Sequence, residues 1–220
     1  VKIDVDSLSA KTTWIFGFEG PGGVASRTGM TKTAPAVDDD SVEEMNFAVF
    51  SCSRWESGFF HAYNIAANLD KLDFWLHLGD YMYEQNVAGM ESARTGPEWA
   101  LDPPNELSTT NEYRARYAQY HTDEALQNLR ARAPVIAIWD DHELVNGVFA
   151  TGSSDHQAAT EGNFSVRVNL AARVYLEWMP IREGSFFQDT GLITGIDITQ
   201  VVQWGSLATM AVLDTRIKSR

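Results

Sequence analysis

The sequence predicts an α/β domain built on a parallel sheet, and three features of the chain support this prediction. Short apolar runs at 47–53, 73–80 and 135–139 have the length of buried strands, and segments with helical spacing lie between them. Strand and helix in alternation favour parallel strands joined by right-handed crossovers. The chain has 220 residues and 44% hydrophobic residues, which is enough for a substantial core.

The first residues, 1–34, are predicted to be β structure of a different kind. "TTWIFGFEG" alternates apolar with small or polar residues, "PGG" fits a turn, and "VASRTGMTKT" fits a returning strand. Two or three strands are marginally stable alone, so we interpret 1–34 as the remnant of a β-sandwich domain. Residues 35–45, with a proline and a run of acids, are predicted to be a linker.

Residues 46–220 are predicted to form the α/β domain itself. Gly, Pro and Asn fill 84–108 without a clear period, which predicts a long loop. Thr109 and Glu112 fit a capping box, and the helix that they open is predicted to run to about Arg132. Apolar residues at helical spacing predict helices at 58–70 and 163–179. Two apolar runs around Gly205-Ser206 predict a β-hairpin at 197–214.

The net charge of −13 argues against partners that are themselves strongly anionic, such as nucleic acid. If the substrate is nevertheless an anion, cations must lie in the site. No apolar run approaches the roughly 18 residues of a membrane span, and no signal peptide is visible. The chain has one cysteine, Cys52, so an intrachain disulfide is excluded.

Each predicted strand of the sheet ends in residues that could hold a metal ion. Cys52 follows the first strand, Asp80 and Tyr83 follow the second, and Asp141 and His142 follow the third. The carboxyl ends of parallel strands share one edge, so we expect these side chains to converge. A carboxylate can bridge two cations. Thiolate and phenolate groups suit iron, whereas carboxylates and carbonyls suit calcium or magnesium.

Four of these five residues also have a purely structural explanation. Asp80 fits a turn or a helix cap, Asp141 and His142 fit a polar loop, and Cys52 fits a small buried hydrophobe. Their positions at equivalent strand ends favour a shared site. His77, inside an apolar run, is predicted to be a core residue.

Taken together, "FAVFSCSRWESGFFHAYNIA", "LDFWLHLGDYMYE", "YRARYAQYHTDEALQNLRARAPVIAIWDDHELVN" and "VLDTR" resemble the PhoD-like alkaline phosphatase/phosphodiesterase family. The resemblance implies a metallophosphoesterase-type αβ-sandwich, preceded by the last strands of a fibronectin-like or immunoglobulin-like domain. It also implies hydrolysis of small phosphate monoesters and diesters with Fe³⁺ and Ca²⁺, and an extracytoplasmic location.

Carried over residue by residue, the resemblance assigns four metal ligands and one catalytic residue. Cys52 and Tyr83 match iron ligands, Asp80 matches the carboxylate shared between metals, and Asp141 matches a further ligand. His142 matches the histidine that meets the phosphate or the leaving group. Members of the family complete the site with ligands on later strands, so we expect this chain to be a fragment, truncated at both ends, that carries the first half of the sandwich.

Two other hypotheses remain open at this point. The chain could be a non-catalytic fragment or binding module that keeps the fold without a complete metal site. It could also be a metal-free hydrolase in which Asp80 and either Asp141 or Glu143 serve as acid and base. That last mechanism leaves Cys52 and Tyr83 without a role.

Overall fold

We describe the fold from a computed structural model, which covers residues 2–86, 92–182 and 197–218. Its central element is a three-stranded sheet in the order β3-β4-β5, formed by β3 (Phe47–Phe50), β4 (Phe74–His77) and β5 (Val135–Ala137). Both pairs of neighbouring strands are parallel. The predicted parallel sheet is therefore confirmed, and its central strand, β4, is buried along its whole length, as expected for a strand covered on both faces.

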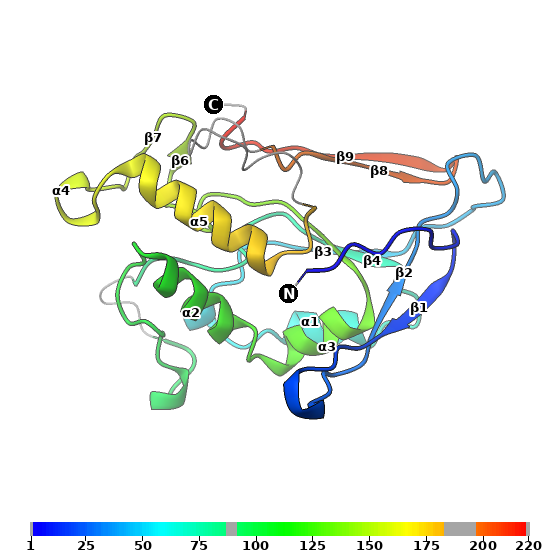
Figure 1. The fold of residues 1–220 in the computed structure, drawn as a ribbon, viewed down its shortest axis with the longest axis horizontal. Coiled ribbons are helices and arrows are strands. Elements are labelled where there is room, and N and C mark those ends of the chain that lie inside the picture. The colour runs from blue at the N-terminus through cyan, green and yellow to red at the C-terminus, as the bar shows by residue number, and fades with distance from the viewer. Residues whose placement is uncertain (1, 87–91, 183–196, 219–220) are drawn as a thin grey trace.

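Helices cover one face of this sheet and a hairpin covers the other (Figure 1). The helices are α1 (His61–Ala67), α2 (Thr110–Tyr120), α3 (Glu124–Arg132), the short α4 (Ala158–Glu161) and α5 (Phe164–Trp178). The hairpin is β8 (Gln200–Trp204) and β9 (Ala208–Val212), which pair antiparallel around the predicted turn. None of the helices in the described residues is long and apolar enough to cross a membrane.

Alternate residues of β4 supply the two sides of the core. Trp75 and His77 face the helices, where both rings lie near the ring of Tyr63 on α1, with centroids 6.0 and 6.5 Å away. Phe74 faces the hairpin and packs on Trp204, with ring centroids 5.4 Å apart. His77 is 1% exposed, which confirms its predicted place in the core.

The single helix predicted from Thr109 to Arg132 is wrong in one respect, because the structure divides it into α2 and α3. The capping box of Thr109 and Glu112 is present at the start of α2. The division falls at His121–Asp123, where the Asp123 side chain accepts a hydrogen bond from the Leu126 backbone N–H and caps α3.

The N-terminal β structure is a single hairpin of β1 (Thr13–Phe16) and β2 (Gly29–Lys32), paired antiparallel. A β-sandwich domain and the boundaries predicted around 34 and 45 stay predictions. The predicted linker contacts the rest of the chain, because the Asp39 carbonyl accepts a hydrogen bond from the Ser206 backbone N–H in the turn of the β8–β9 hairpin. Between 84 and 108, the described residues contain only a short 3-10 turn, η3 (Pro97–Trp99), which agrees with the predicted loop.

Candidate metal centre

The loops that leave β3 and β4 are tied together by backbone hydrogen bonds. The N–H of Cys52 donates to the carbonyl of Gly79 at 3.1 Å, and the N–H of Ser53 donates to the carbonyl of Asp80 at 2.8 Å. The pairing of the two strands thus continues past their ends, and it brings the first two predicted ligand-bearing segments side by side.

Both ligand candidates in these loops have a left-handed backbone conformation. The φ angle is 57° at Cys52 and 54° at Asp80, a region that residues other than glycine adopt rarely. Gly79, with φ of 105°, leaves no room for a side chain, because a Cβ there would lie 2.3 Å from the backbone nitrogen of Asp140. Backbone strain of this kind is concentrated at functional sites, and here it aims two potential ligands at one edge of the sheet.

Asp80, Asp141 and His142 form a compact cluster. Each offers one ligand atom, and these atoms all lie within 4.8 Å of one another. The Asp80 and Asp141 side chains are buried, and burial raises the pKa of Asp80, with the neighbouring aspartates adding to the effect. The Oδ1 atom of Asp80 is buried and has no hydrogen-bond partner among the described residues. A bound cation would supply that partner, so the residues fit a metal site.

Tyr83 and Cys52 lie beside this cluster. The Tyr83 hydroxyl donates a hydrogen bond to Oδ2 of Asp80 at 3.0 Å. Burial, and after it the charge of Asp80 and contact with the Cys52 thiol, raise the pKa of Tyr83 well above its usual value. Cys52 itself is exposed, so the alternative of a buried structural cysteine is wrong. Because its pKa is raised in this way, the Tyr83 hydroxyl would need a cation beside it to become a phenolate.

His142 is held by a residue to which the sequence analysis gave no role, Glu84. Its Oε2 atom lies 2.7 Å from Nδ1 of His142, and its Oε1 atom accepts the backbone N–H of Asn146 at 2.6 Å. Burial alone would lower the pKa of His142, but the bond to Glu84 and the charges of the cluster raise it above the ordinary histidine value. The ring also lies against that of Tyr83, with centroids 4.2 Å apart.

Glu143 is a buried brace between the loops that follow β4 and β5. Its carboxylate accepts the backbone N–H of Tyr81 at 2.5 Å and that of Asp140 at 2.9 Å. Burial raises the pKa of Glu143 to about 8. No helix starts at Glu143, because the next helix, α4, begins only at 158.

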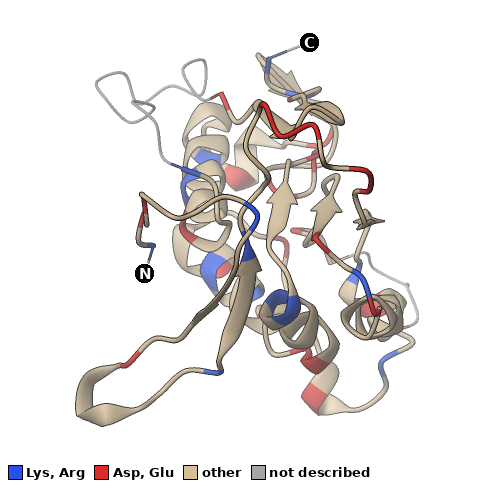
Figure 2. Cartoon of the chain, turned by 90° about the vertical axis from the view of Figure 1, so that its right-hand side faces the viewer, with Lys and Arg blue, Asp and Glu red and all other residues tan. Residues whose placement is uncertain are grey.

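Arg216, next to the β9 end of the hairpin, reaches the same edge. Its guanidinium forms an ion pair with Asp140 and lies 3.4 Å from Oδ1 of Asp141. The other Asp141 oxygen, Oδ2, accepts the backbone N–H of Gly147 at 2.7 Å. Elsewhere in the described part of the chain, Lys and Arg are scattered between the acids (Figure 2).

Comparison with known proteins agrees with this geometry. Residues 47–220 match the family model described as PhoD-like phosphatase. The chain belongs to the PhoD-like phosphatase family. It is 35% identical over 218 residues to alkaline phosphatase D of Bacillus subtilis (strain 168), a match that covers 98% of this chain and 35% of that relative.

A solved structure of PhoD has a TM-score of 0.82 to this chain at 33% sequence identity, covering 96% of this chain and 38% of that one. The mixed α/β fold predicted from the sequence is thus confirmed in a known member of the family. The chain spans little more than a third of the length of the relatives that it matches.

Proposed function

We propose that this chain carries the first part of a metal-dependent site for the hydrolysis of phosphate monoesters or diesters, and that residues beyond the chain complete the site. One observation carries the proposal. Asp80 is a buried carboxylate with an oxygen that has no hydrogen-bond partner in the described residues, and one of its oxygens lies within 4.8 Å of ligand atoms of Asp141 and His142 at the carboxyl edge of a parallel sheet. Uncompensated acids at such a place are costly, and cations that offset them would also attract a phosphate ester to a chain of net charge −13.

In this proposal Cys52, Tyr83 and Asp80 would hold one cation, and Asp80 and Asp141 would hold a second. Thiolate and phenolate ligands favour Fe³⁺ for the first cation, and carboxylate oxygens favour Ca²⁺ for the second. When bound, such ions would lower the pKa of water and stabilise negative charge on the phosphoryl oxygens.

The chain's own residues then handle the proton. Because Glu84 occupies Nδ1 of His142, Nε2 is left to face the substrate. The raised pKa of His142 favours its protonated form, which can donate a hydrogen bond to a phosphoryl oxygen or a proton to the departing alcohol. Glu84 fixes the ring, and Glu143 fixes the two loops that carry the ligands.

Elemental analysis of the whole protein to which this chain belongs, combined with hydrolysis of p-nitrophenyl phosphate and bis(p-nitrophenyl) phosphate, tests the proposal. We expect bound iron and turnover that a chelator abolishes. Asp80→Asn should lose both. Asp73→Asn is the matched control, because Asp73 is an equally buried acid at the opposite end of β4, where it pairs with Lys32.

A whole protein that folds, binds no metal and hydrolyses neither ester would overturn the proposal. Turnover that survives exhaustive chelation would instead support the metal-free mechanism with Asp80 as one of two catalytic carboxylates. The ratio of the two rates gives the preference between monoester and diester. Secretion stays a prediction of the resemblance.

A further inference from the structure

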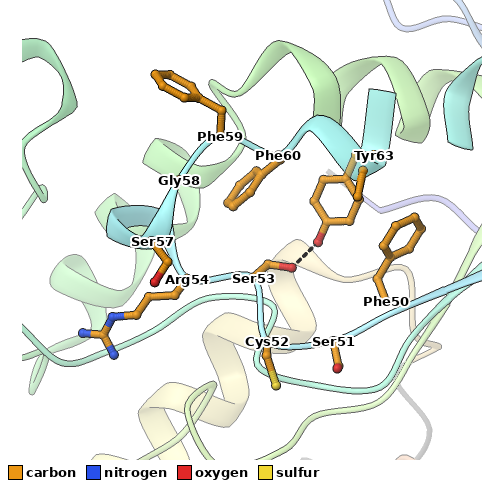
Figure 3. Close-up of a pocket in the computed structure, with 11 residues that line it drawn as sticks. Phe50, Ser51, Cys52, Ser53, Arg54, Ser57, Gly58, Phe59, Phe60 and Tyr63 are labelled. Atoms are coloured by element: carbon orange, nitrogen blue, oxygen red, sulfur yellow. Dashed lines mark hydrogen bonds between the residues drawn. The ribbon is translucent and has the colours of Figure 1, made fainter. Parts of the chain in front are cut away.

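A pocket opens beside Cys52, on the side of the sheet edge where the loop after β3 faces the start of α1. It has a volume of about 240 Å³, larger than the roughly 150 Å³ of an apolar cavity that holds benzene. The lining includes three phenylalanines, one cation and several small side chains, and it consists of residues 50–54 and 57–60 with Ala62 and Tyr63. Figure 3 shows the Phe59 and Phe60 rings above the strand end that carries Cys52 and Arg54.

We propose that this pocket binds the alcohol portion of the ester substrate and selects for an aromatic ring there. The inference rests on the proposed function, because it places the pocket as the leaving-group subsite of that metal centre. Two of its lining residues reach the centre directly. The Cys52 thiol contacts Tyr83, and the Arg54 guanidinium lies over the Tyr83 ring, 4.8 Å from its centroid.

The apolar wall is held in place before any ligand binds. Phe59 is 45% exposed, yet its ring packs edge-on against Trp99 with centroids 5.3 Å apart. Beneath it the buried guanidinium of Arg94 lies 4.9 Å from the Phe59 ring and 4.6 Å from the Phe60 ring. The same guanidinium pairs with Asp123 at 2.9 Å, so the aromatic wall is anchored to the cap of α3.

The wall is therefore a preorganised aromatic surface open to solvent. A single exposed phenylalanine needs no explanation. A Phe held from behind by a buried cation and a tryptophan offers a fixed ring face to a ligand without a cost in side-chain ordering. Planar rings favour such contacts by offset or edge-to-face stacking.

The opposite side of the pocket is polar and equally ordered. The Ser53 hydroxyl is hydrogen-bonded to the Tyr63 hydroxyl and lies 3.2 Å from Nε2 of the buried His77. Arg54 pairs with Glu56 at 3.2 Å, and its Nε atom is buried without a hydrogen-bond partner in the described residues. The Arg54 guanidinium, which lies over the Tyr83 ring and has this unpartnered Nε donor, would favour an electron-rich aromatic group in the ligand.

Room for the ring comes from small residues. A Cβ added at Gly58 would meet nothing within 4 Å. Ser51, Ser57 and Ala62 are exposed at the rim. A large side chain at Ala62, which lies on α1, would fill the pocket without touching the metal centre.

Binding of two phosphonates that the site cannot hydrolyse tests the proposal on the metal-loaded chain. Phenylphosphonate and methylphosphonate offer the same anionic group to the centre and differ only in the ring. We expect calorimetry to show about tenfold tighter binding of the phenyl compound, because stacking and burial of one ring face contribute on that order. The preference should fall to about twofold in Phe59→Ala and disappear in Ala62→Trp.

Ile65→Trp is the matched control, because Ile65 is an exposed residue of the same helix, 68% accessible and outside the pocket. It should keep the tenfold preference. Equal affinity for the two compounds in the natural chain, or a preference that survives Ala62→Trp, would overturn the subsite. Failure of the metal centre gives a different result, because methylphosphonate would then not bind at all. Phenylphosphonate binding that persists in that case would support the pocket, and loss of both would overturn it.

Discussion

Replacing Glu84 with glutamine should lower the pKa of His142 by about one to two pH units. The reason is the contact between Glu84 Oε2 and His142 Nδ1, which is 2.7 Å long and has a fully buried acid on one side. A hydrogen bond to a charged group contributes about 1.5–3 kcal/mol, and 1.36 kcal/mol corresponds to one pH unit. Glutamine keeps the size of the side chain and an acceptor for the Asn146 N–H, so the change removes mainly the charge.

Titration of the histidine ring signals by NMR in the metal-free chain measures this effect without relying on turnover, and His142→Asn assigns the signal. Glu106→Gln is a suitable control, since Glu106 is a partly buried acid paired with Arg167 at 2.8 Å and does not touch the histidine. A His142 pKa that is the same in Glu84→Gln and in the natural chain would refute the assigned role of Glu84. In the active protein the same change should move the alkaline limb of the pH–rate profile to lower pH.

Three further predictions concern stability. Burial lowers the pKa of both His77 and His121 to about 3. Between pH 3 and the ordinary histidine pKa of about 6.5, these two side chains are protonated in the unfolded chain but not in the folded one. The free energy of unfolding, measured by urea titration, should therefore fall by about 1.4 kcal/mol per pH unit for each histidine as the pH drops below 6.5. Gly79→Ala should cost more than about 3 kcal/mol in thermal unfolding, because its Cβ would overlap Asp140; a loss under 1 kcal/mol would contradict the geometry. Glu143→Gln should cost about 1–3 kcal/mol, because an amide offers one acceptor oxygen to two backbone N–H groups, and unchanged stability would show that the brace is dispensable.

The strands and most helices were predictable because their signals are local. Apolar runs with polar ends predicted β3, β4 and β5, and the capping box predicted the start of α2. The break between α2 and α3 was missed because apolar spacing continues across it. Asp123 at the break is an N-cap residue followed by Glu124, so a local signal for a second helix was present but outweighed by the period.

The support of the site was harder to predict than its centre. Asp80 and Asp141 stand out as acids directly after apolar strands. Glu84 lies in "LGDYMYE", the same segment as Asp80, but its partner His142 lies 58 residues further along the chain. Arg216 and Asp140 are 76 residues apart. The pairing of side chains so far apart in the sequence depends on how the loops fold back on the sheet. Residue spacing in a single sequence does not predict that folding.

The left-handed conformations of Cys52 and Asp80 have a consequence for engineering. Glycine would relax either backbone by about 1 kcal/mol or more, so these two positions offer gains in melting temperature. Both changes would remove a proposed ligand. A variant library sorted for thermal tolerance alone should therefore become enriched in changes that erase the metal centre. Selection for a more robust form of this protein needs retention of metal as a second criterion from the first round.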